Sequence, residues 1–216
     1  MSSVTKLRAS VPIACLVALL AGCVDRPTMR RPSVQPVRGL DPAALKICIG
    51  KLDRVVARYA LLPDRTFSPG CSALSAVQLR DIGTRASNLG AMTCPLAFAF
   101  TQWVQSDLQV PAIGEFGSAV VKVETMGTYA CRPIAGSGRL SEHATANAVD
   151  VAAFILADGR RISVLEGWNG DERHARFLRS VRVSACRRFN TVLSPDYNAD
   201  HRDHMHFDMG RGPFCR

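Results

Sequence analysis

Several functional signatures are missing from the sequence. Its eight cysteines include no C-x-x-C pair, so neither a cysteine-based zinc site nor a redox motif is expected. No aromatic RNA-binding motif and no helix-turn-helix pattern are present, which argues against nucleic acid as a partner. There is no internal repeat, and the apolar run at residues 11–20 has only about half of the roughly 20 residues that a membrane-spanning helix needs.

The N-terminus has the pattern of an export signal. Lys6 and Arg8 precede the apolar run, which ends in Leu-Ala-Gly-Cys at residues 20–23. This tetrapeptide resembles the bacterial lipoprotein box, whose cysteine receives lipid and becomes the first residue of the mature chain. We therefore expect residues 1–22 to be a signal peptide and Cys23 to anchor the protein in the bacterial cell envelope, facing the periplasm; Val24 favours the outer membrane. An ordinary signal peptide with an incidental cysteine and a short membrane anchor remain alternatives.

The chain is basic, with a formal net charge of +9. Removal of residues 1–22 takes Lys6 and Arg8 from the 27 basic side chains and leaves 25 against 18 acidic ones. A surplus of this size favours solubility and attraction to anionic polymers. For an exported protein we expect the partners to be peptidoglycan and, through the lipid, the membrane.

Six cysteines remain after Cys15 and Cys23 are assigned to the export signal. An even number in an exported chain predicts up to three disulfides, which six cysteines can form in 15 ways. We favour a bond between Cys186 and Cys215, which would tie a late helix to the C-terminus, and leave the other pairings open. The six are Cys48, Cys71, Cys94, Cys131, Cys186 and Cys215.

The mature chain divides into a short tether and one domain. Residues 23–40 are rich in proline and poor in apolar residues, which is typical of an extended, semi-rigid tether. Residues 41–216 number about 175, enough for one domain with a substantial core.

The domain has signals for both helices and strands. Helices are expected to begin at Asp41-Pro42 and at Thr93-Cys94-Pro95, the second one buried, and an amphipathic helix is expected over residues 171–189. Strands are expected at residues 119–125, 148–156, 161–165 and 204–209. Helices mixed with hairpin strands predict an α+β domain with a small antiparallel sheet flanked by helices.

The chemistry of the sequence concentrates in two short segments. Six residues separate His143 from Asp150, and three of the five histidines lie within residues 201–206. In a strand His204, His206 and Asp208 share one face, because residues two apart point to the same side. Imidazole and carboxylate groups are suitable ligands for zinc, and three of them leave a position open for catalysis.

These residues resemble a known family. From about Cys71 to Phe214 the chain is similar to the bacterial extensin-like C-terminal domain proteins. The similarity lies in residues 93–96 and Trp103, and in segments 129–132, 141–150, 185–189 and 198–206.

The same residues resemble a broader group of zinc peptidases. It contains D-alanyl-D-alanine carboxypeptidases, lysostaphin-type endopeptidases and murein endopeptidase, with the pattern S-x-H-x₆-D and a late H-x-H. The resemblance implies the core shared by hedgehog proteins and D-alanyl-D-alanine peptidases, with zinc as the cofactor. Its ligands would be His143, Asp150 and His206.

Further roles are implied for residues around these ligands. His204 would handle protons or stabilise the transition state beside the metal, and Arg132 would face the scissile carbonyl. His201 completes the three-histidine spacing of murein endopeptidase and is a further catalytic candidate. Ser141 would orient a ligand. Asp208, judged from its position in the strand, could either hydrogen-bond a ligand histidine or simply end the strand.

The chain also departs from the pattern of the group. Ala146 stands three residues after the first histidine, where the group usually has glycine, and a left-handed backbone would be strained there. No E-x-H glutamate is present, so a base would have to be His204, His201 or an acid such as Asp203.

Trp168, in a Gly-Trp-Asn-Gly segment, is expected on an exposed loop where it could line a cleft.

Two functions fit these features. The first is a lipid-anchored zinc metallopeptidase that hydrolyses amide bonds in the stem peptides of peptidoglycan, as either an endopeptidase or a carboxypeptidase. The second is a lipoprotein that binds the wall or regulates another hydrolase without catalysis and retains the fold of the metal site. The complete ligand set favours the enzyme, because a pure binding protein has little need for an open metal position.

Overall fold

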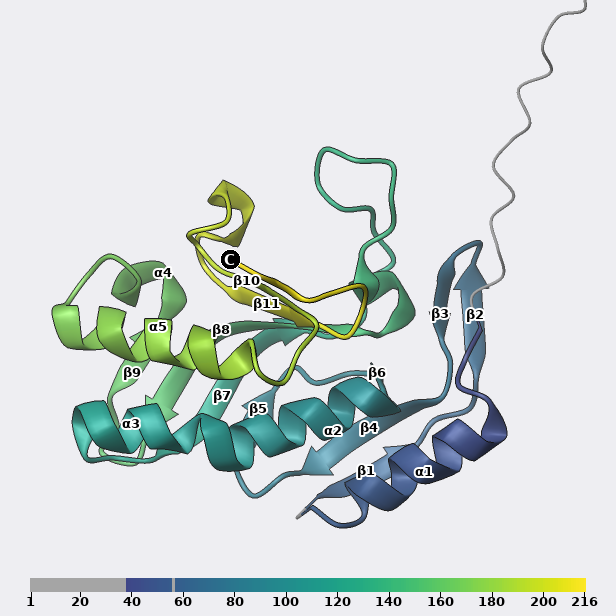
Figure 1. Ribbon diagram of the computed structural model, residues 1–216, viewed down its shortest axis with the longest axis horizontal. Helices are drawn as coiled ribbons and strands as arrows, with labels where there is room; N and C mark the ends of the chain where they lie inside the picture. Colours follow the sequence, from purple (N-terminus) through teal and green to yellow (C-terminus); the bar gives the residue numbers. More distant parts are fainter. Residues whose placement is uncertain (1–37, 56) are drawn as a thin grey trace, which may run out of the picture. The chain divides into compact units, whose positions relative to one another are not determined.

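A mixed sheet forms the centre of the computed structural model, which describes residues 38–55 and 57–216 (Figure 1). Within these residues the sheet has seven strands. Six lie side by side in the order β12 (Phe214–Cys215), β10 (Thr191–Leu193), β11 (Met205–Asp208), β8 (Ala148–Leu156), β7 (Val120–Gly127) and β5 (Arg85–Ser87). The seventh, β9 (Arg161–Ser163), pairs with β8.

The four central strands are antiparallel, as expected, but both edges are parallel. Strand β5 runs parallel to β7, and β12 runs parallel to β10. The first pairing arises because a helical crossover separates β5 from β7 in the chain, and such crossovers join parallel strands. The second arises because β11 reverses the chain between β10 and β12. The prediction of a small antiparallel sheet therefore holds for the central strands and is wrong for the two edges, whereas the α+β class is confirmed.

Smaller elements precede the crossover. Helix α1 (Pro42–Leu52) begins where the sequence predicted, with the Asp41 side chain accepting from the Ala44 amide. A second sheet joins β1 (Arg58–Leu61), β4 (Ala76–Asp81) and β6 (Met92–Thr93), and a hairpin joins β2 (Arg65–Ser68) to β3 (Cys71–Ala73).

The crossover is a nearly continuous helical segment that carries the centre of the core. Helix α2 (Cys94–Gln102) continues through a π-helical turn, η1 (Trp103–Asp107), into α3 (Gln109–Phe116). Trp103 is fully buried; its indole nitrogen donates to Ser184 Oγ at 2.9 Å and its ring packs edge-on against Phe207. Because Phe207 directly follows His206 on β11, this packing fixes the strand that carries His206.

Helix α5 (Glu172–Ala185) packs beside the crossover (Figure 1). It begins after Asp171, whose carboxylate accepts from the amides of Arg173 and His174. It buries Leu178, Val181 and Ala185, as an amphipathic helix requires, and also Phe177, but it ends four residues earlier than expected.

Two expectations about the segment before α5 were wrong. The predicted strand 161–165 ends at Ser163, because the Ser163 hydroxyl accepts from the Glu166 amide and starts the short helix α4 (Val164–Gly167). Trp168 is buried rather than exposed on a loop. Its indole nitrogen donates to Asp196 at 2.8 Å, and the Arg179 guanidinium lies 4.9 Å above its ring.

Three disulfides join the described elements. The predicted bond between Cys186 and Cys215 is confirmed and ties the end of α5 to β12. The other two bonds are Cys48–Cys94, between α1 and α2, and Cys71–Cys131, between β3 and the loop that carries Arg132.

The N-terminal predictions concern residues largely outside this description. The expected signal peptide, the lipidated Cys23 and all but the last three residues of the tether lie outside the described residues. Among the helices of the described part, none combines the length and apolarity needed to cross a membrane.

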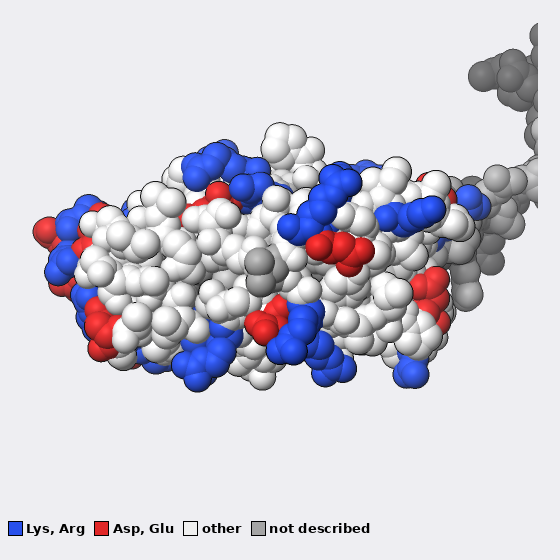
Figure 2. All heavy atoms as spheres, turned by 90° about the horizontal axis from the view of Figure 1, so that it is seen from below, with Lys and Arg blue, Asp and Glu red and all other residues white. Residues whose placement is uncertain are grey.

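Exposed charges are distributed in both signs over the face seen in Figure 2. Acidic side chains lie next to several of the basic ones on this face. Among the described residues, ion pairs between exposed or partly exposed side chains include Arg58–Asp81 at 3.0 Å and Arg161–Glu124 at 2.9 Å. Exposed pairs contribute at most about 1 kcal/mol to stability, so the stability of the fold rests on its core and disulfides.

Candidate metal centre

His143 is held in place by its backbone turn and by its outer ring nitrogen. It lies in the short 3₁₀ turn η2 (Glu142–Thr145), where the Ser141 hydroxyl accepts from the His143 amide at 3.3 Å. Its Nδ1 atom lies 3.1 Å from the carbonyl oxygen of Thr128. A carbonyl can only accept, so Nδ1 carries the hydrogen and Nε2 of the neutral ring presents a lone pair.

Asp150 and His206 are brought together by strand register. Asp150 on β8 pairs directly with His206 on β11. Asp150 Oδ1 lies 2.9 Å from His206 Nδ1, and Asp150 Oδ2 lies 3.0 Å from His143 Nε2. All three side chains are at least 90% buried. The H-x₆-D spacing therefore places a turn residue and a strand residue around one point.

His206 is oriented by Asp208 in the way that His143 is oriented by Thr128. Its Nε2 atom lies 3.0 Å from Asp208 Oδ2, and Asp208 Oδ1 accepts from the Gly210 amide at 2.7 Å. An ionised carboxylate can only accept, so Nε2 carries the hydrogen and donates it. In the neutral ring the lone pair is then on Nδ1, facing Asp150 and His143.

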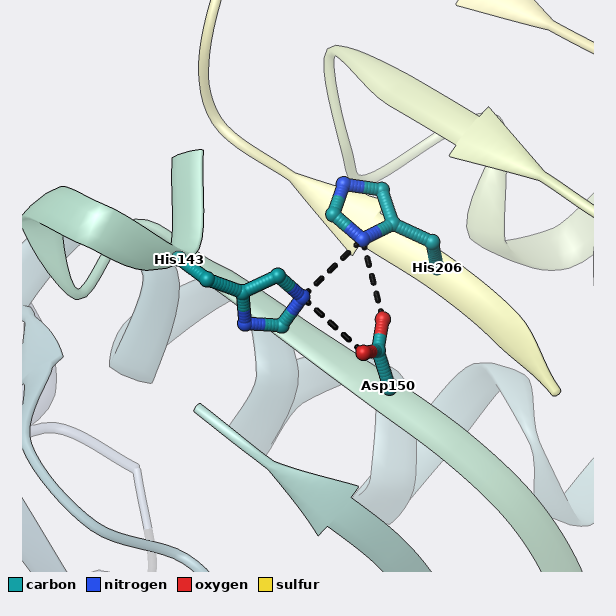
Figure 3. Close-up of side chains that lie close together, drawn as sticks. All are labelled: His143, Asp150 and His206. Atoms are coloured by element: carbon teal, nitrogen blue, oxygen red, sulfur yellow. Dashed lines mark hydrogen bonds and ion pairs between the residues drawn. The ribbon is translucent and has the colours of Figure 1, made fainter. Parts of the chain in front are cut away.

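The site therefore presents three electron-rich atoms to a common point (Figure 3). His143 Nε2 and His206 Nδ1 lie 3.2 Å apart, and the Asp150 carboxylate forms the third corner, with one oxygen near each nitrogen. Burial raises the pKa of Asp150, but the hydrogen bonds with His143 and His206 outweigh it and hold that pKa well below its usual range. Burial lowers the pKa of His206, but hydrogen bonds with Asp150 and Asp208 outweigh it and raise the pKa to about 9. The arrangement requires a cation at its centre, either a proton or a metal ion.

The geometry of the three groups suits a metal ion. One ligand atom from each of His143, Asp150 and His206 lies within 4.8 Å of the others. Nitrogen and oxygen ligands about 2.1 Å from a tetrahedral metal lie about 3.4 Å from one another, close to the 2.9–3.2 Å found here. Both histidines also bond outward through their second nitrogen, as metal-binding histidines almost always do. This buried group can hold a metal ion.

His204 lies beside the three inward groups without joining them. It precedes β11, and its Nε2 atom is 3.7 Å from Asp150 Oδ1. Its Nδ1 atom donates to Asp203 Oδ1 at 2.9 Å, and this hydrogen bond lowers the pKa of Asp203. His204 Nε2 is therefore the nitrogen that faces the site.

His201 is farther from the centre. It ends the 3₁₀ turn η3 (Ala199–His201), and its ring lies 5.1 Å from that of His204 and 6.1 Å from that of His206. Its Nδ1 atom lies 2.6 Å from Asn198 Oδ1. Burial and the neighbouring rings of His204 and His206 lower the pKa of His201 to about 4, so it is neutral at pH 7.

Arg132 approaches the site from the solvent side. A guanidinium nitrogen lies 3.7 Å from Asp150 Oδ2, and half of the side chain is exposed. Because the arginine is not enclosed, the guanidinium remains accessible to a ligand that enters the cleft.

The centre opens into a cleft of about 740 Å³. Its walls come from the loop between β7 and η2, which stands out from the sheet in Figure 1, and from the C-terminal segments around η3 and β12. A cleft of this size holds a ligand of a few residues. Its lining includes Arg132, Ser141, His201, His204, His206 and Asp208.

The structure also shows partners that the sequence did not indicate. The Thr128 carbonyl that fixes His143 is a backbone atom, which no residue pattern marks. Asn198, which holds His201, stands three residues before it, and this short spacing is the one local signal that could have found it. Trp168 makes no contribution to the cleft lining.

Ala146 has a left-handed backbone conformation, which suits the glycine that the zinc peptidases usually have at this position. It caps η2 with φ 55° and ψ 28°, and its side chain is fully buried. The departure in sequence therefore leaves the backbone turn after His143 in place, at the expense of local strain.

Comparison with known proteins identifies one family. The family model described as extensin-like protein C-terminus matches residues 46–216, which extends the resemblance toward the N-terminus beyond Cys71. No curated protein and no solved structure matches the chain. Because the model covers more than half of the sequence, the chain belongs to the extensin-like protein C-terminus family.

Proposed function

We propose that this protein is a zinc-dependent hydrolase of the bacterial cell envelope that cleaves amide bonds in peptidoglycan stem peptides. The observation that carries the proposal is the set of three inward lone pairs, from His143, Asp150 and His206, beside an open cleft. Two imidazoles and one carboxylate are the donor set of hydrolytic zinc sites, whereas calcium and magnesium prefer oxygen ligands throughout. The related pattern in zinc peptidases supports the same choice.

Zinc, when bound, supplies a Lewis acid that polarises a carbonyl and lowers the pKa of water. The residues around it supply orientation and proton handling. His204 presents Nε2 to the site while Asp203 accepts from its Nδ1, so Nε2 can take a proton from the attacking group and pass it to the leaving amine.

Arg132 and His201 complete the proposed machinery. The Arg132 guanidinium, 3.7 Å from Asp150 at the mouth of the cleft, can stabilise negative charge on the oxygen of the scissile carbonyl. His201 is neutral at pH 7, and with Nδ1 directed at Asn198 it can offer Nε2 to a substrate or to His204.

The envelope location rests on the sequence. The signal peptide pattern, Cys23 in its lipoprotein box and the basic mature chain together support a lipid-anchored protein that acts on the wall from the periplasmic side. The three disulfides agree with an oxidising compartment.

Metal content and muropeptide digestion test the proposal together. The protein without residues 1–22 is purified, its metal measured, and muropeptides are incubated with it, with and without a chelator. We expect about one zinc per chain and products, identified by mass spectrometry, that disappear with chelator and return with zinc.

Variants separate the site from the activity. His143→Ala and Asp150→Ala should lose the zinc, whereas His174→Ala, on α5 away from the cleft, should keep it. Unchanged zinc content in the first two variants would refute the ligand assignment. Zinc without metal-dependent products across wall types would favour the non-catalytic wall-binding lipoprotein.

A further inference from the structure

Two cationic side chains line the cleft beyond the metal centre. Arg139 lies on the loop between β7 and η2, and Arg211 lies between β11 and β12. Both are exposed, and within the described part of the chain neither guanidinium has a hydrogen bond or an ion pair. By contrast Arg160 and Arg188, elsewhere on the surface, pair with Asp158 and Asp107.

The backbone of each of these two residues is fixed. The Arg139 carbonyl accepts from the Ile134 amide at 2.8 Å, which closes the tip of the loop, and the Cys71–Cys131 disulfide fixes its base. The Arg211 carbonyl accepts from the Thr191 hydroxyl at 3.2 Å. Both side chains therefore extend from fixed backbone positions at the cleft, so a ligand that binds them does not have to order the backbone as well.

Acids of the cleft are mostly engaged by other groups. Asp208 accepts from His206 and from the Gly210 amide. Glu142 accepts from the Asn147 side chain at 2.7 Å. Asp200, on η3, is the third acid of the lining. The two arginines are thus left for an anionic group that comes from outside the protein.

The remaining lining adds an apolar component. Four of its side chains are large, apolar and at least 40% exposed: Ile134, Leu140, Tyr197 and Phe214. A ligand that combines short apolar side chains with a negative charge matches this surface. Stem peptides, with their alanines and free carboxylates, have this chemistry.

We propose that Arg139 and Arg211 form a carboxylate-binding subsite that selects stem peptides whose carboxylates are free rather than amidated. Guanidinium binds carboxylate through two parallel hydrogen bonds, a geometry that lysine cannot reproduce. The inference rests on the proposed function, because that function supplies the peptide ligand.

Binding of two peptides that differ only in charge tests the subsite. The zinc-loaded protein without residues 1–22 is titrated calorimetrically with the tripeptide L-Ala-γ-D-Glu-L-Lys and with the same tripeptide amidated at both carboxylates. Mass spectrometry of the sample establishes that the peptide is intact. We expect the free acid to bind about tenfold or more tightly than the diamide, the range for a charge-assisted hydrogen bond.

Matched variants assign the preference to the two arginines. Arg139→Gln and Arg211→Gln should each reduce the preference, and the double variant should abolish it. Arg139→Lys and Arg211→Lys should each show a weaker preference for the free acid than the parent protein. Lysine keeps the positive charge but lacks the planar guanidinium that binds a carboxylate through two hydrogen bonds. Arg80→Gln, an exposed arginine outside this cleft, should leave it unchanged. Melting temperature and zinc content should match the parent protein in every variant.

Three results would overturn the subsite: equal affinity for the two peptides, no binding of either, or an equal effect of Arg80→Gln. Hydrolysis is measured separately on amidated and free muropeptides. Hydrolysis without a carboxylate preference would refute the subsite alone. A carboxylate preference that depends on Arg139 and Arg211, with no hydrolysis, would refute the hydrolase and leave the subsite standing.

Discussion

His143 Nε2 and His206 Nδ1 face each other across 3.2 Å, with the outer nitrogen of each ring bonded to a group that accepts a hydrogen. As neutral rings they direct two lone pairs at the same point as the Asp150 carboxylate. The two lone pairs and the negative carboxylate repel one another. The protein can relieve this repulsion by keeping a proton on His206 or by binding a metal ion. Proton and metal therefore compete for one position.

This competition predicts that metal binding releases a proton. The pKa of His206 is raised to about 9, so at pH 7.5 the metal-free protein holds a proton that the metal must displace. We expect zinc affinity to rise about tenfold per pH unit below pH 9. Calorimetry in two buffers with different ionisation enthalpies should show about one proton released per zinc at pH 7.5. A binding enthalpy independent of the buffer would contradict this account.

Asp208→Asn should weaken metal binding while leaving all three ligands in place. The carboxylate holds His206 in the tautomer that offers Nδ1 inward, and such partners contribute about 10- to 100-fold to metal affinity. A chelator competition assay should show this loss. Asp200→Asn is the control, because Asp200 lines the same cleft without contacting a ligand ring. Equal affinity in both variants would show that the ligand tautomer does not depend on Asp208.

Asp203→Asn should lower turnover without changing zinc content. Asp203 accepts from His204 Nδ1 and leaves Nε2 facing the site, whereas an asparagine amide can donate and favour the wrong tautomer. We expect kcat on muropeptides to fall at least about tenfold, with KM little changed. A change confined to KM would indicate that His204 binds substrate rather than handles protons.

Strand geometry accounts for two of the three residues of the candidate metal group, whereas the full set of three was implied by the resemblance to zinc peptidases. Once β8 and β11 pair, Asp150 and His206 are opposite each other, and the alternation of β11 puts Met205 and Phe207 in the core. The groups that fix the ligand tautomers were predicted less completely. Asp208 follows from the same alternation, but the Thr128 carbonyl depends on how the loop after β7 folds back, which no local pattern records.

The wrong predictions near residue 163 have a local physical cause. An apolar run with β-branched residues favoured a strand to residue 165, but Ser163 is also a good helix cap and its hydroxyl bonds the Glu166 amide. The resulting turn carries Trp168 inward, where Asp196 satisfies its indole nitrogen. Propensity for a strand was thus overridden by a cap and a distant partner.

Ala146 provides a test of strain next to the metal site. Its left-handed backbone costs an alanine about 1–2 kcal/mol, which glycine would not incur. Its methyl group, however, packs in a small buried cluster with Ala73 and Ala76, and removing it costs about 0.8 kcal/mol. Glycine also adds about 0.4–1 kcal/mol of chain entropy to the unfolded state. The terms nearly cancel, so Ala146→Gly should change the free energy of unfolding by less than about 1 kcal/mol.

Ala153→Gly isolates the strain by removing a methyl group from an unstrained position. Ala153 is equally buried but lies in strand β8, where glycine relieves nothing. The substitution Ala153→Gly should therefore destabilise the protein by about 1–2 kcal/mol more than Ala146→Gly does. Ala146→Val should be the most destabilising of the three, because a β-branched side chain is an outlier in the left-handed region. Denaturant unfolding with the disulfides intact measures all three. If Ala146→Gly is as destabilising as Ala153→Gly, the turn after His143 stores no strain, and the alanine there is as well tolerated as the usual glycine.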